Sequence, residues 1–333
     1  MAFGKLGAAL TAREIQGLVA ADLEQVEAFI ADECVGSVEQ ISEIARYLHS
    51  AGGKRIRPTL LLLSTRLFTE PNRDAIQLAA VVEMIHAATL VHDDVIDVAT
   101  TRRGRPSANV IWGNHASVLA GDWMYMQAFQ VALRMRNFHV LDVLIGLTQL
   151  MVEGELIQLQ RIGRIDVSET DYMELIDRKT AALFSACARL GAVAGGADEA
   201  VESRLSEFAW NLGMAFQLVD DLLDFTAREK VLGKPVGNDL QEGKVTLPLI
   251  YALEDATPQE RQDVETVLRD GNYSRVPLSR IQEFIRERRG LARARERANF
   301  FTERARTLIA TFPESRYQEA LAAVTDLVTE RES

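Results

Sequence analysis

Apolar residues recur at three- and four-residue spacing in segment after segment of this chain, and no stretch shows a sustained alternation bounded by hairpin turns. The first spacing places apolar side chains on one face of an α-helix, whereas alternation is typical of half-buried strands. All eight prolines fall at or near the starts of these helical patterns or between them, where proline is tolerated. The sequence therefore predicts an all-α fold.

The predicted helices follow one another without a break that would divide the chain. No linker rich in Gly, Ser or Pro and no solenoid repeat separates them. We therefore expect residues 1–333 to form a single domain. The predicted helices cover residues 11–32, 37–50, 57–69, 73–98, 115–136, 138–161, 168–194, 198–227, 245–255, 258–269, 277–288, 290–311 and a last segment from 314.

Two of these helices should lie at the centre of the bundle. Helix 73–98 is apolar nearly all round between Met84 and Val91, and helix 198–227 shares this property in WNLGMAFQLVDDLLDF. A helix that is apolar on every side has no face suited to water, so it must be covered by other helices.

The formal net charge of −11 argues against a nucleic-acid partner, which would need a basic face. The same charge disfavours other anionic ligands, unless divalent cations held by carboxylates mediate the contact. Cys34 and Cys187 show no spacing typical of a disulfide framework or a zinc site, which favours a reducing compartment. The pattern shows neither a targeting nor a membrane-spanning segment. We therefore expect a cytoplasmic protein.

Two DDxxD motifs stand in the sequence, each directly after a long uncharged segment of a helix predicted to be buried. Spacing of three and four residues stacks carboxylates on one helix face, where like charges repel. Near the C-terminal end of a helix the macrodipole disfavours them further, so each motif needs a cation, and we expect Mg²⁺. One such motif alone could be a solvated acidic patch, but two should face each other at the rim of the core. The motifs are Asp93, Asp94 and Asp97, and Asp220, Asp221 and Asp224.

Two basic segments flank the first acidic motif. AGGKRIRP contains Lys54 and Arg57, and TTRRGRP contains Arg102 and Arg103. Paired glycines let the backbone approach a ligand closely, and the guanidinium fork matches diphosphate oxygens. Basic loops are common, but together with the acidic motifs they predict a site for two phosphorylated substrates, one held through metal and one held by basic side chains.

The motifs together show a family resemblance. GGKRIRP, EMIHAATLVHDDVID, RRGRP, GDWMY, the KT of DRKTAALF, FQLVDDLLDF and GKPVGNDLQEGKVTLPL occur in the order seen in trans-isoprenyl diphosphate synthases. These motifs cover about residues 40–255, and the chain most resembles bacterial octaprenyl diphosphate synthases, which make the side chain of ubiquinone. The resemblance implies the isoprenoid synthase fold, a helical bundle around a central cavity. It also implies a Mg²⁺-dependent prenyltransferase that condenses isopentenyl diphosphate with an allylic diphosphate, with farnesyl diphosphate as the expected primer.

The resemblance also assigns roles to individual residues. Those expected to hold isopentenyl diphosphate are Lys54, Arg57, His86 and Arg103. Those expected around the allylic diphosphate are Arg102, Lys179, Thr180, Gln217 and Lys234, and the first four of these are also the candidate catalytic residues. The expected main ligands of two to three Mg²⁺ ions are Asp93, Asp97 and Asp220, with Asp94, Asp221 and Asp224 ligating or holding metal-bound water.

His86 and Asn238 are two positions at which the sequence departs from a simple match to the assigned roles. His86 lies in an apolar run, where a buried core histidine is the usual outcome, and only its place in the family pattern assigns it to a substrate. Asn238 stands in GNDL where the family usually has an acid, although Asp239 remains. The change puts in doubt a negative charge close to the metal ligands.

The implied reaction needs no nucleophile from the protein. Loss of pyrophosphate from the allylic substrate leaves a carbocation, which the isopentenyl double bond attacks before a proton passes to the departing pyrophosphate. The growing chain should run along the helix that precedes Asp93, past Thr89, Ala88 and Ile85, where no Phe or Tyr would plug a tunnel. An open tunnel predicts a long product, and the resemblance suggests octaprenyl diphosphate.

Three alternatives remain open from the sequence. A shorter-chain geranylgeranyl synthase would share these motifs. A class I terpene cyclase would share the first acidic motif, but it usually replaces the second by an Asn/Ser/Glu pattern and lacks the isopentenyl pocket. A non-catalytic subunit of a heteromeric synthase would typically have lost acidic residues. The resemblance further implies a homodimer and transient membrane contact for release of the product.

Overall fold

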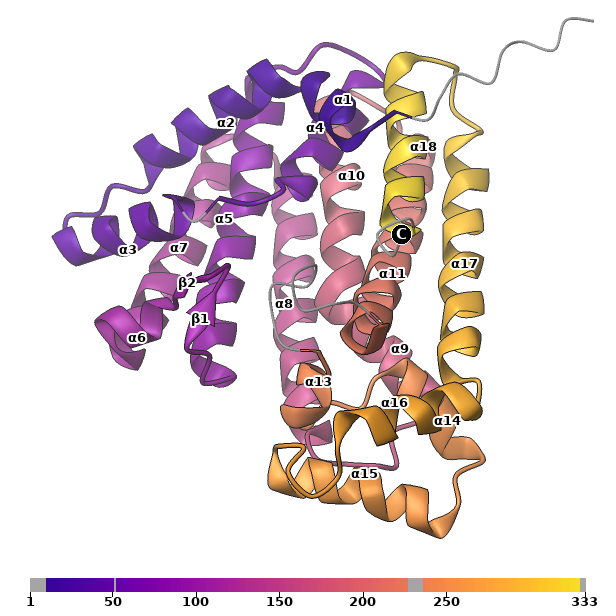
Figure 1. The fold of residues 1–333 in the computed structure, drawn as a ribbon. Coiled ribbons are helices and arrows are strands. Elements are labelled where there is room, and N and C mark those ends of the chain that lie inside the picture. Colours follow the sequence, from indigo (N-terminus) through magenta and orange to yellow (C-terminus); the bar gives the residue numbers. More distant parts are fainter. Residues whose placement is uncertain (1–9, 51, 227–235, 330–333) are drawn as a thin grey trace, which may run out of the picture.

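The computed structural model describes residues 10–50, 52–226 and 236–329, and they form the predicted all-α fold (Figure 1). Long helices pack side by side, and short helices close one end of the bundle. In the first half the helices are α1 Ala12–Gly17, α2 Ala20–Glu33, α3 Glu39–Ser50, α4 Ile56–Arg66, α5 Arg73–Ile96, α6 Ala108–Trp112, α7 Asn114–Arg134 and α8 Phe138–Arg161. In the second half they are α9 Glu169–Ile176, the π-helical turn η1 Asp177–Ala181, α10 Ala182–Ala194, α11 Glu199–Thr226, α13 Asn238–Gln241, α14 Leu247–Glu254, α15 Pro258–Asp270, α16 Leu278–Glu287, α17 Gly290–Ile309 and α18 Arg316–Thr329.

Local sequence explains where several of these helices begin. The side chains of Asn72 and Asn137 accept hydrogen bonds from the first turns of α5 and α8. Ser168 and Thr257 form capping boxes at α9 and α15. Such caps satisfy backbone N–H groups that have no partner inside the helix.

The centre of the bundle is built from helices α5, α10 and α11. Helix α10 packs against α4, α5, α8 and α11, and α11 packs against α17 and α18 on its other side. Gly191 of α10 allows this close approach, because a Cβ there would lie 2.4 Å from the Leu61 carbonyl oxygen of α4. The main apolar cluster extends from Ile15 to Val328, which supports our proposal that the chain is one domain.

Helix α5 is the buried helix that the sequence predicted. Its residues 75–85 are all buried, as are Ala88 and Val91. Of the helices in the described residues, only α5 is long and apolar enough to cross a membrane, and 72% of its most apolar window is buried inside the bundle. This extent of burial is expected of the core helix of a globular protein.

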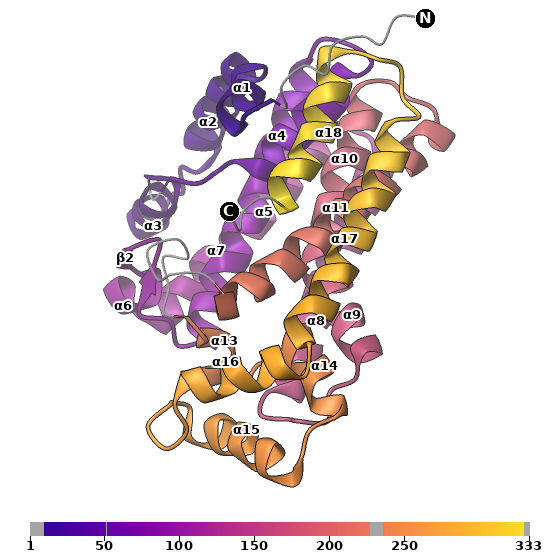
Figure 2. The same cartoon turned by 45° about the vertical axis from the view of Figure 1, so that its right-hand side comes forward.

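The short helices α14, α15 and α16 lie together at one end of the bundle (Figure 2). At this end α13 follows α11, and the loop after α13 leads into α14. The C-terminal ends of α5, α8 and α11 approach each other on the same side, and together they position the functional site described below.

Three local features differ from the predicted helices. The predicted helix 11–32 is divided between α1 and α2 near Leu18, and the predicted helix 168–194 is interrupted by η1. The segment after α5 also forms a two-stranded antiparallel hairpin, β1 Thr101–Arg102 with β2 Arg105–Pro106, followed by the short helix α6. Positive φ angles at Arg103 (53°) and Gly104 (74°) make this turn, the conformation that suits two-residue hairpin loops.

Candidate active site

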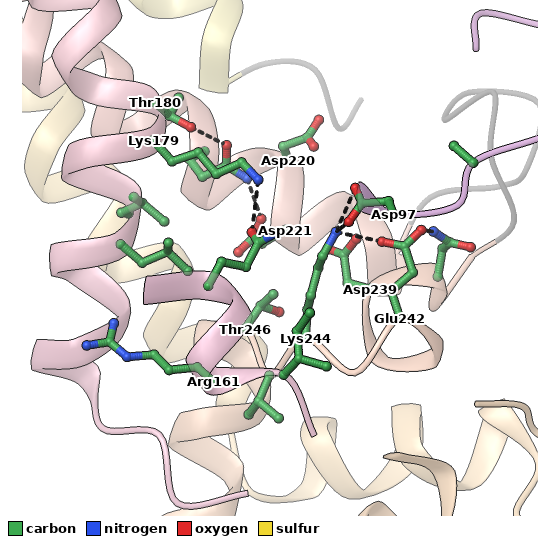
Figure 3. A pocket seen from close by; sticks show the side chains of 18 of the residues that line it. Asp97, Arg161, Lys179, Thr180, Asp220, Asp221, Asp239, Glu242, Lys244 and Thr246 are labelled. Atoms are coloured by element: carbon green, nitrogen blue, oxygen red, sulfur yellow. Dashed lines mark hydrogen bonds and ion pairs between the residues drawn. The ribbon is translucent and has the colours of Figure 1, made fainter. Parts of the chain in front are cut away.

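A cavity of about 1130 Å³ opens where the C-terminal ends of α5, α8 and α11 meet η1, α13 and the β-hairpin (Figure 3). Its volume is sufficient for a large polar ligand. Residues predicted from separate motifs converge on its wall. They are Asp97, Arg102, Arg103, Lys179, Thr180, Gln217, Asp220 and Asp221.

The first acidic motif ends α5 at the rim of this cavity. Lys244 Nζ donates to both oxygens of the Asp97 carboxylate, at a distance of 3.4 Å from each. Burial raises the pKa of Asp93 to about 6, opposed by the charge of Lys179 and assisted by the charges of Glu155 and Asp97. A carboxylate whose charged form is disfavoured in this way gains from a nearby cation.

Asp94 has a different environment within the same motif. It is 1% exposed, and Arg102 donates to its Oδ1 through Nε at 2.8 Å and Nη2 at 2.5 Å. Burial raises the pKa of Asp94 despite this ion pair. The interaction ties β1 to α5 and fixes the direction of the Arg102 guanidinium.

The second acidic motif lies in the last turns of α11. Asp221 and Asp224 are buried, and Asp220 and Asp221 line the cavity. Asp221 Oδ2 accepts from the Tyr172 hydroxyl at 2.5 Å, and Asp224 Oδ2 accepts from the backbone N–H of Asp239 at 3.3 Å. Burial, followed by the charge of Asp239, raises the pKa of Asp221 well above its usual range. The two motifs thus concentrate carboxylates around one cavity.

Lys179 and Thr180 project from the π-helical turn η1. Lys179 Nζ lies 2.5 Å from Glu155 Oε2 and 3.1 Å from Gln158 Oε1, both on α8. Thr180 Oγ1 donates to Gln217 Oε1 at 2.9 Å. A π-helical turn is rare, and turns of this kind are frequent at functional sites.

Two glycines let the neighbouring helices approach this turn. A Cβ at Gly154 of α8 would lie 3.1 Å from the backbone nitrogen of Lys179. A Cβ at Gly213 of α11 would lie 2.7 Å from Ala181 Cα. Any side chain at Gly213 would therefore displace η1 and move Lys179 and Thr180 from the cavity wall.

A basic pocket lies beside the cavity, between α4, α5 and the hairpin. Arg57 Nη1 lies 2.9 Å from His86 Nε2, and because arginine only donates, this nitrogen is the acceptor. Burial and then the charges of Arg57 and Arg103 lower the pKa of His86 well below its usual value, so the ring is neutral. Burial and the charge of Arg103 lower the pKa of Arg57. The buried Arg57 Nε has no hydrogen-bond partner among the described residues. Such a pocket is suited to an anion.

Arg55 is a residue of this pocket to which the sequence assigned no role. Its backbone has a φ of 48°, and its guanidinium forms ion pairs with Glu27 of α2 and Glu83 of α5, each at 2.5 Å. The side chain of Arg103 lies against Gly53, where a Cβ would be 2.9 Å from Nη1. The glycine therefore leaves room for Arg103, as expected of a backbone close to a ligand-binding side chain.

Other predicted residues lie outside these contacts. Lys54 is exposed at the entrance of the AGGKRIRP loop, and Lys234 lies outside the described residues. Ile85 and Ala88 are fully buried in α5, and Ala88 packs in a cluster with Val91 and Met124. Thr89 is partly buried and donates to the His86 carbonyl at 2.8 Å. Their roles in product length remain predictions.

The cavity contains functional groups that the sequence did not single out. Lys244 bridges Asp97 and Glu242, and Asn238 donates to Glu242 at 2.5 Å. Lys244 stands in the GNDLQEGK motif, so its position in that motif was a usable signal. Tyr172 had no comparable signal, because it occupies an ordinary apolar position of a short helix.

The carboxylates at this cavity suit a metal ion that other ligands also hold. In the described part of the chain, no three His, Cys, Asp or Glu side chains gather closely enough to hold an ion by themselves. Mg²⁺ is commonly held by one or two carboxylates together with waters and substrate phosphates, so carboxylates spread around a cavity fit this ion when a diphosphate is present.

Comparisons with known proteins agree on one family. The sequence profile of the Polyprenyl synthetase family matches residues 38–284. An octaprenyl diphosphate synthase of Escherichia coli (strain K12) is 37% identical over 319 residues, which cover 96% of this chain and 98% of that protein. The structure of a decaprenyl diphosphate synthase from Rhodobacter capsulatus has a TM-score of 0.92 and 35% identity, covering 97% of this chain and 100% of the other. The structure of a polyprenyl synthase from Caulobacter crescentus CB15, complexed with calcium and isoprenyl diphosphate, has a TM-score of 0.91 and 35% identity, covering 98% and 100%.

Proposed function

The chain belongs to the polyprenyl synthetase family and is a prenyltransferase, and on this premise we propose how its cavity performs the reaction. The substrates are isopentenyl diphosphate and an allylic diphosphate, and the product is a long-chain polyprenyl diphosphate. The observation that carries this proposal is the single cavity whose wall joins Asp97, Asp220 and Lys179 to the basic hairpin.

The acidic side of the cavity binds the allylic diphosphate through Mg²⁺. Asp93, Asp97 and Asp220 are the proposed main ligands, and Asp94, Asp221 and Asp224 support them. The raised pKa of Asp93 supports this role, because a cation would offset both the loss of hydration on burial and the repulsion by Asp97. When two or three Mg²⁺ ions are bound, they neutralise the leaving diphosphate. The relative from Caulobacter crescentus was solved with a divalent cation, calcium, and isoprenyl diphosphate.

Side chains of the protein orient the allylic substrate and stabilise charge. Lys179 and Arg102 contact the leaving diphosphate, and the carboxylates of Glu155 and Asp94 hold these cations in place. Lys234 is proposed to join them. The hydroxyl of Thr180 and the amide of Gln217 present oxygen atoms near the carbon that becomes positive as the diphosphate leaves.

The basic pocket binds isopentenyl diphosphate without metal. Arg57 and Arg103 supply charge, neutral His86 supplies a ring nitrogen, and Lys54 contributes from the loop entrance. The buried Arg57 guanidinium has no carboxylate ion pair among the described residues, so its charge remains available to a diphosphate. The isopentenyl double bond then attacks the allylic cation, and the proton passes to the departing pyrophosphate.

The growing chain passes along α5, past Thr89, Ala88 and Ile85. The wall has no aromatic side chain at these positions, which supports a long product, and we propose octaprenyl diphosphate for the ubiquinone side chain. Farnesyl diphosphate is the proposed primer. The relatives include both an octaprenyl and a decaprenyl diphosphate synthase, so the length must be measured.

A second copy of this chain is the proposed partner of helices α7 and α8. On α7, Leu119, Met126 and Leu133 are exposed at seven-residue intervals. On α8, exposed apolar residues repeat with the same interval at Phe138, Ile145, Val152 and Leu159. Two adjacent helices with such stripes are suited to pairing with the same stripes of another copy. Met126→Glu is expected to convert the dimer to a monomer in light scattering, and a wild-type protein that is monomeric would contradict the pairing.

We propose that the enzyme acts in the cytoplasm and contacts the membrane transiently when it releases its product. Its substrates are charged and water-soluble, whereas a long polyprenyl chain is apolar. Sedimentation with lipid vesicles, with and without turnover, would measure this contact.

Mass spectrometry of the products made from isopentenyl diphosphate, farnesyl diphosphate and Mg²⁺ tests the proposed function. A long-chain polyprenyl diphosphate is expected. A geranylgeranyl product would contradict the proposed length, and a cyclised hydrocarbon would indicate a terpene cyclase. Absence of any prenyl product would contradict the proposed activity.

A further inference from the structure

Tyr172 reaches the cavity from α9, yet it has no role in the reaction described above. Its side chain is 2% exposed, and its hydroxyl donates to Asp221 Oδ2 at 2.5 Å. The other oxygen of this carboxylate, Oδ1, accepts from Gln217 Nε2 at 2.8 Å. Both oxygens of Asp221 are therefore engaged by side chains of the protein.

The hydrogen bonds continue from Gln217 to the π-helical turn. Thr180 Oγ1 donates to Gln217 Oε1 at 2.9 Å, so the chain runs from Tyr172 through Asp221 and Gln217 to Thr180. It connects α9, α11 and η1 at the cavity wall.

These hydrogen bonds fix the direction of the Gln217 amide. The hydroxyl of Tyr172 and the NH₂ group of Gln217 both donate to Asp221, so the oxygens of this carboxyl group act as the acceptors. The amide oxygen must then lie on the side of Thr180. A reversed amide would place its oxygen against Asp221 and its NH₂ group beside the developing positive charge.

Both oxygens of Asp221 are held by side chains, which suits this residue to fix the Gln217 amide. It lines the cavity together with Asp220, is 3% exposed and accepts hydrogen bonds from Tyr172 and Gln217.

We propose that Tyr172 is a positioning residue for prenyl transfer, which holds Asp221 so that the Gln217 amide oxygen remains directed toward the allylic cation. The inference rests on the proposed function, because it needs an allylic cation in this cavity. Removing the hydroxyl leaves Gln217 as the one side-chain donor to Asp221 among the described residues, and the amide can then turn.

The test is Tyr172→Phe, which keeps the aromatic ring in the core and removes only the hydroxyl. We expect kcat to fall about 10- to 100-fold, the range typical of partners that orient an active group. The KM values for both substrates should change by less than about threefold, because Tyr172 contacts neither diphosphate. Binding of inorganic pyrophosphate with Mg²⁺, measured by calorimetry, should equal that of the wild type.

Further variants give the measurement its controls. Tyr317 lies on α18, away from the cavity, and its hydroxyl accepts hydrogen bonds from Arg66 of α4 and Arg316 of α18. Tyr317→Phe removes this hydroxyl and should keep the wild-type kcat. Combining Tyr172→Phe with Gln217→Leu should lower kcat no further than Gln217→Leu alone, because both changes remove the same effect. If Tyr172→Phe does not fold, Tyr172→Met keeps a large apolar side chain in the core without the hydroxyl, and it should show the same fall in kcat with unchanged binding of Mg²⁺ and pyrophosphate.

The possible results separate the inference from the proposed function. A wild-type enzyme that forms no prenyl product contradicts the proposed function and the inference with it. An active wild type with an equally active Tyr172→Phe variant contradicts the inference alone. A variant that loses Mg²⁺-dependent pyrophosphate binding together with kcat would show that Tyr172 acts through metal binding, which also contradicts the inference.

Discussion

Replacing Arg57 by methionine should weaken the binding of isopentenyl diphosphate without lowering the stability of the fold. The guanidinium lies in the interior, beside His86 and over the ring of Phe184, with its centre 5.7 Å from the ring. Burial lowers the pKa of Arg57, so the surroundings disfavour its charge when no anion is bound. The charge is therefore retained for binding, and methionine fills a similar unbranched volume without it.

The two effects can be given magnitudes. A hydrogen bond to a charged group contributes about 1.5–3 kcal/mol, so its loss should raise the KM for isopentenyl diphosphate about 10- to 150-fold. The KM for the allylic diphosphate should change by less than about threefold, because metal neutralises that substrate. Replacing buried charged groups by apolar ones of similar volume is often neutral or stabilising by about 1–4 kcal/mol. The lost bond to His86 costs about 1 kcal/mol, so the free energy of unfolding should stay equal or rise slightly.

The assays are initial rates with each substrate varied in turn and unfolding in denaturant. Arg66→Met is the matched control, because Arg66 lies on the same helix α4 and pairs with the buried Asp22 at 2.7 Å. Its removal leaves Asp22 buried without its counter-ion, which should cost about 3–5 kcal/mol. The KM values of the control should stay at wild-type levels.

Two results would refute this reasoning. An equal rise of both KM values in Arg57→Met would mean that the basic pocket does not distinguish the substrates. A loss of several kcal/mol of stability would mean that Arg57 is a structural cation like Arg66. Lys54→Ala offers a second check. Because Lys54 is exposed, its replacement should raise the KM for isopentenyl diphosphate without any effect on the free energy of unfolding.

Three other predictions concern the acidic motifs and the tunnel. Asp93→Ala and Asp220→Ala should each lower turnover at least about a hundredfold with an unchanged helical circular dichroism spectrum, and near-wild-type turnover in either would contradict a role for both motifs. The pKa of Asp93 is raised from 3.8 to about 6, so its protonated form favours folding and this contribution is lost as the pH rises to about 6. Denaturant titrations of the metal-free protein should show that loss, and Asp93→Asn should reduce it. Ala88→Tyr or Ala88→Phe should yield farnesyl or geranylgeranyl diphosphate as the product in mass spectrometry, because the ring enters a closely packed wall; an unchanged product distribution at good activity would show that Ala88 does not line the tunnel.

Much of the fold was predictable because helix formation is local. The predicted helix 138–161 coincides with α8, whose first turn is capped by Asn137. The buried segment from Met84 to Val91 was recognisable because a helix without a polar face must be covered. The all-α prediction is confirmed on these grounds.

The interruptions of the helices were less predictable. The turn η1 has a sequence, DRKTA, that suits a regular helix, and it becomes a π-helical turn where Gly154 and Gly213 let two helices approach. The β-hairpin contains only two residues in each strand, too few to show an alternation. In both places the conformation depends on neighbours that are distant in the sequence.

The sequence by itself determined the residue types of the site and the segments that carry them. The two acidic motifs follow from spacing, since residues three and four apart share a helix face, and the two basic segments follow from their glycines and arginines. Only the tertiary structure decided the partners, such as Lys244 for Asp97, Arg102 for Asp94 and Tyr172 for Asp221. The physical reason is that a hydrogen bond forms within about 3 Å, and whether two side chains on different helices come that close depends on how the whole core packs.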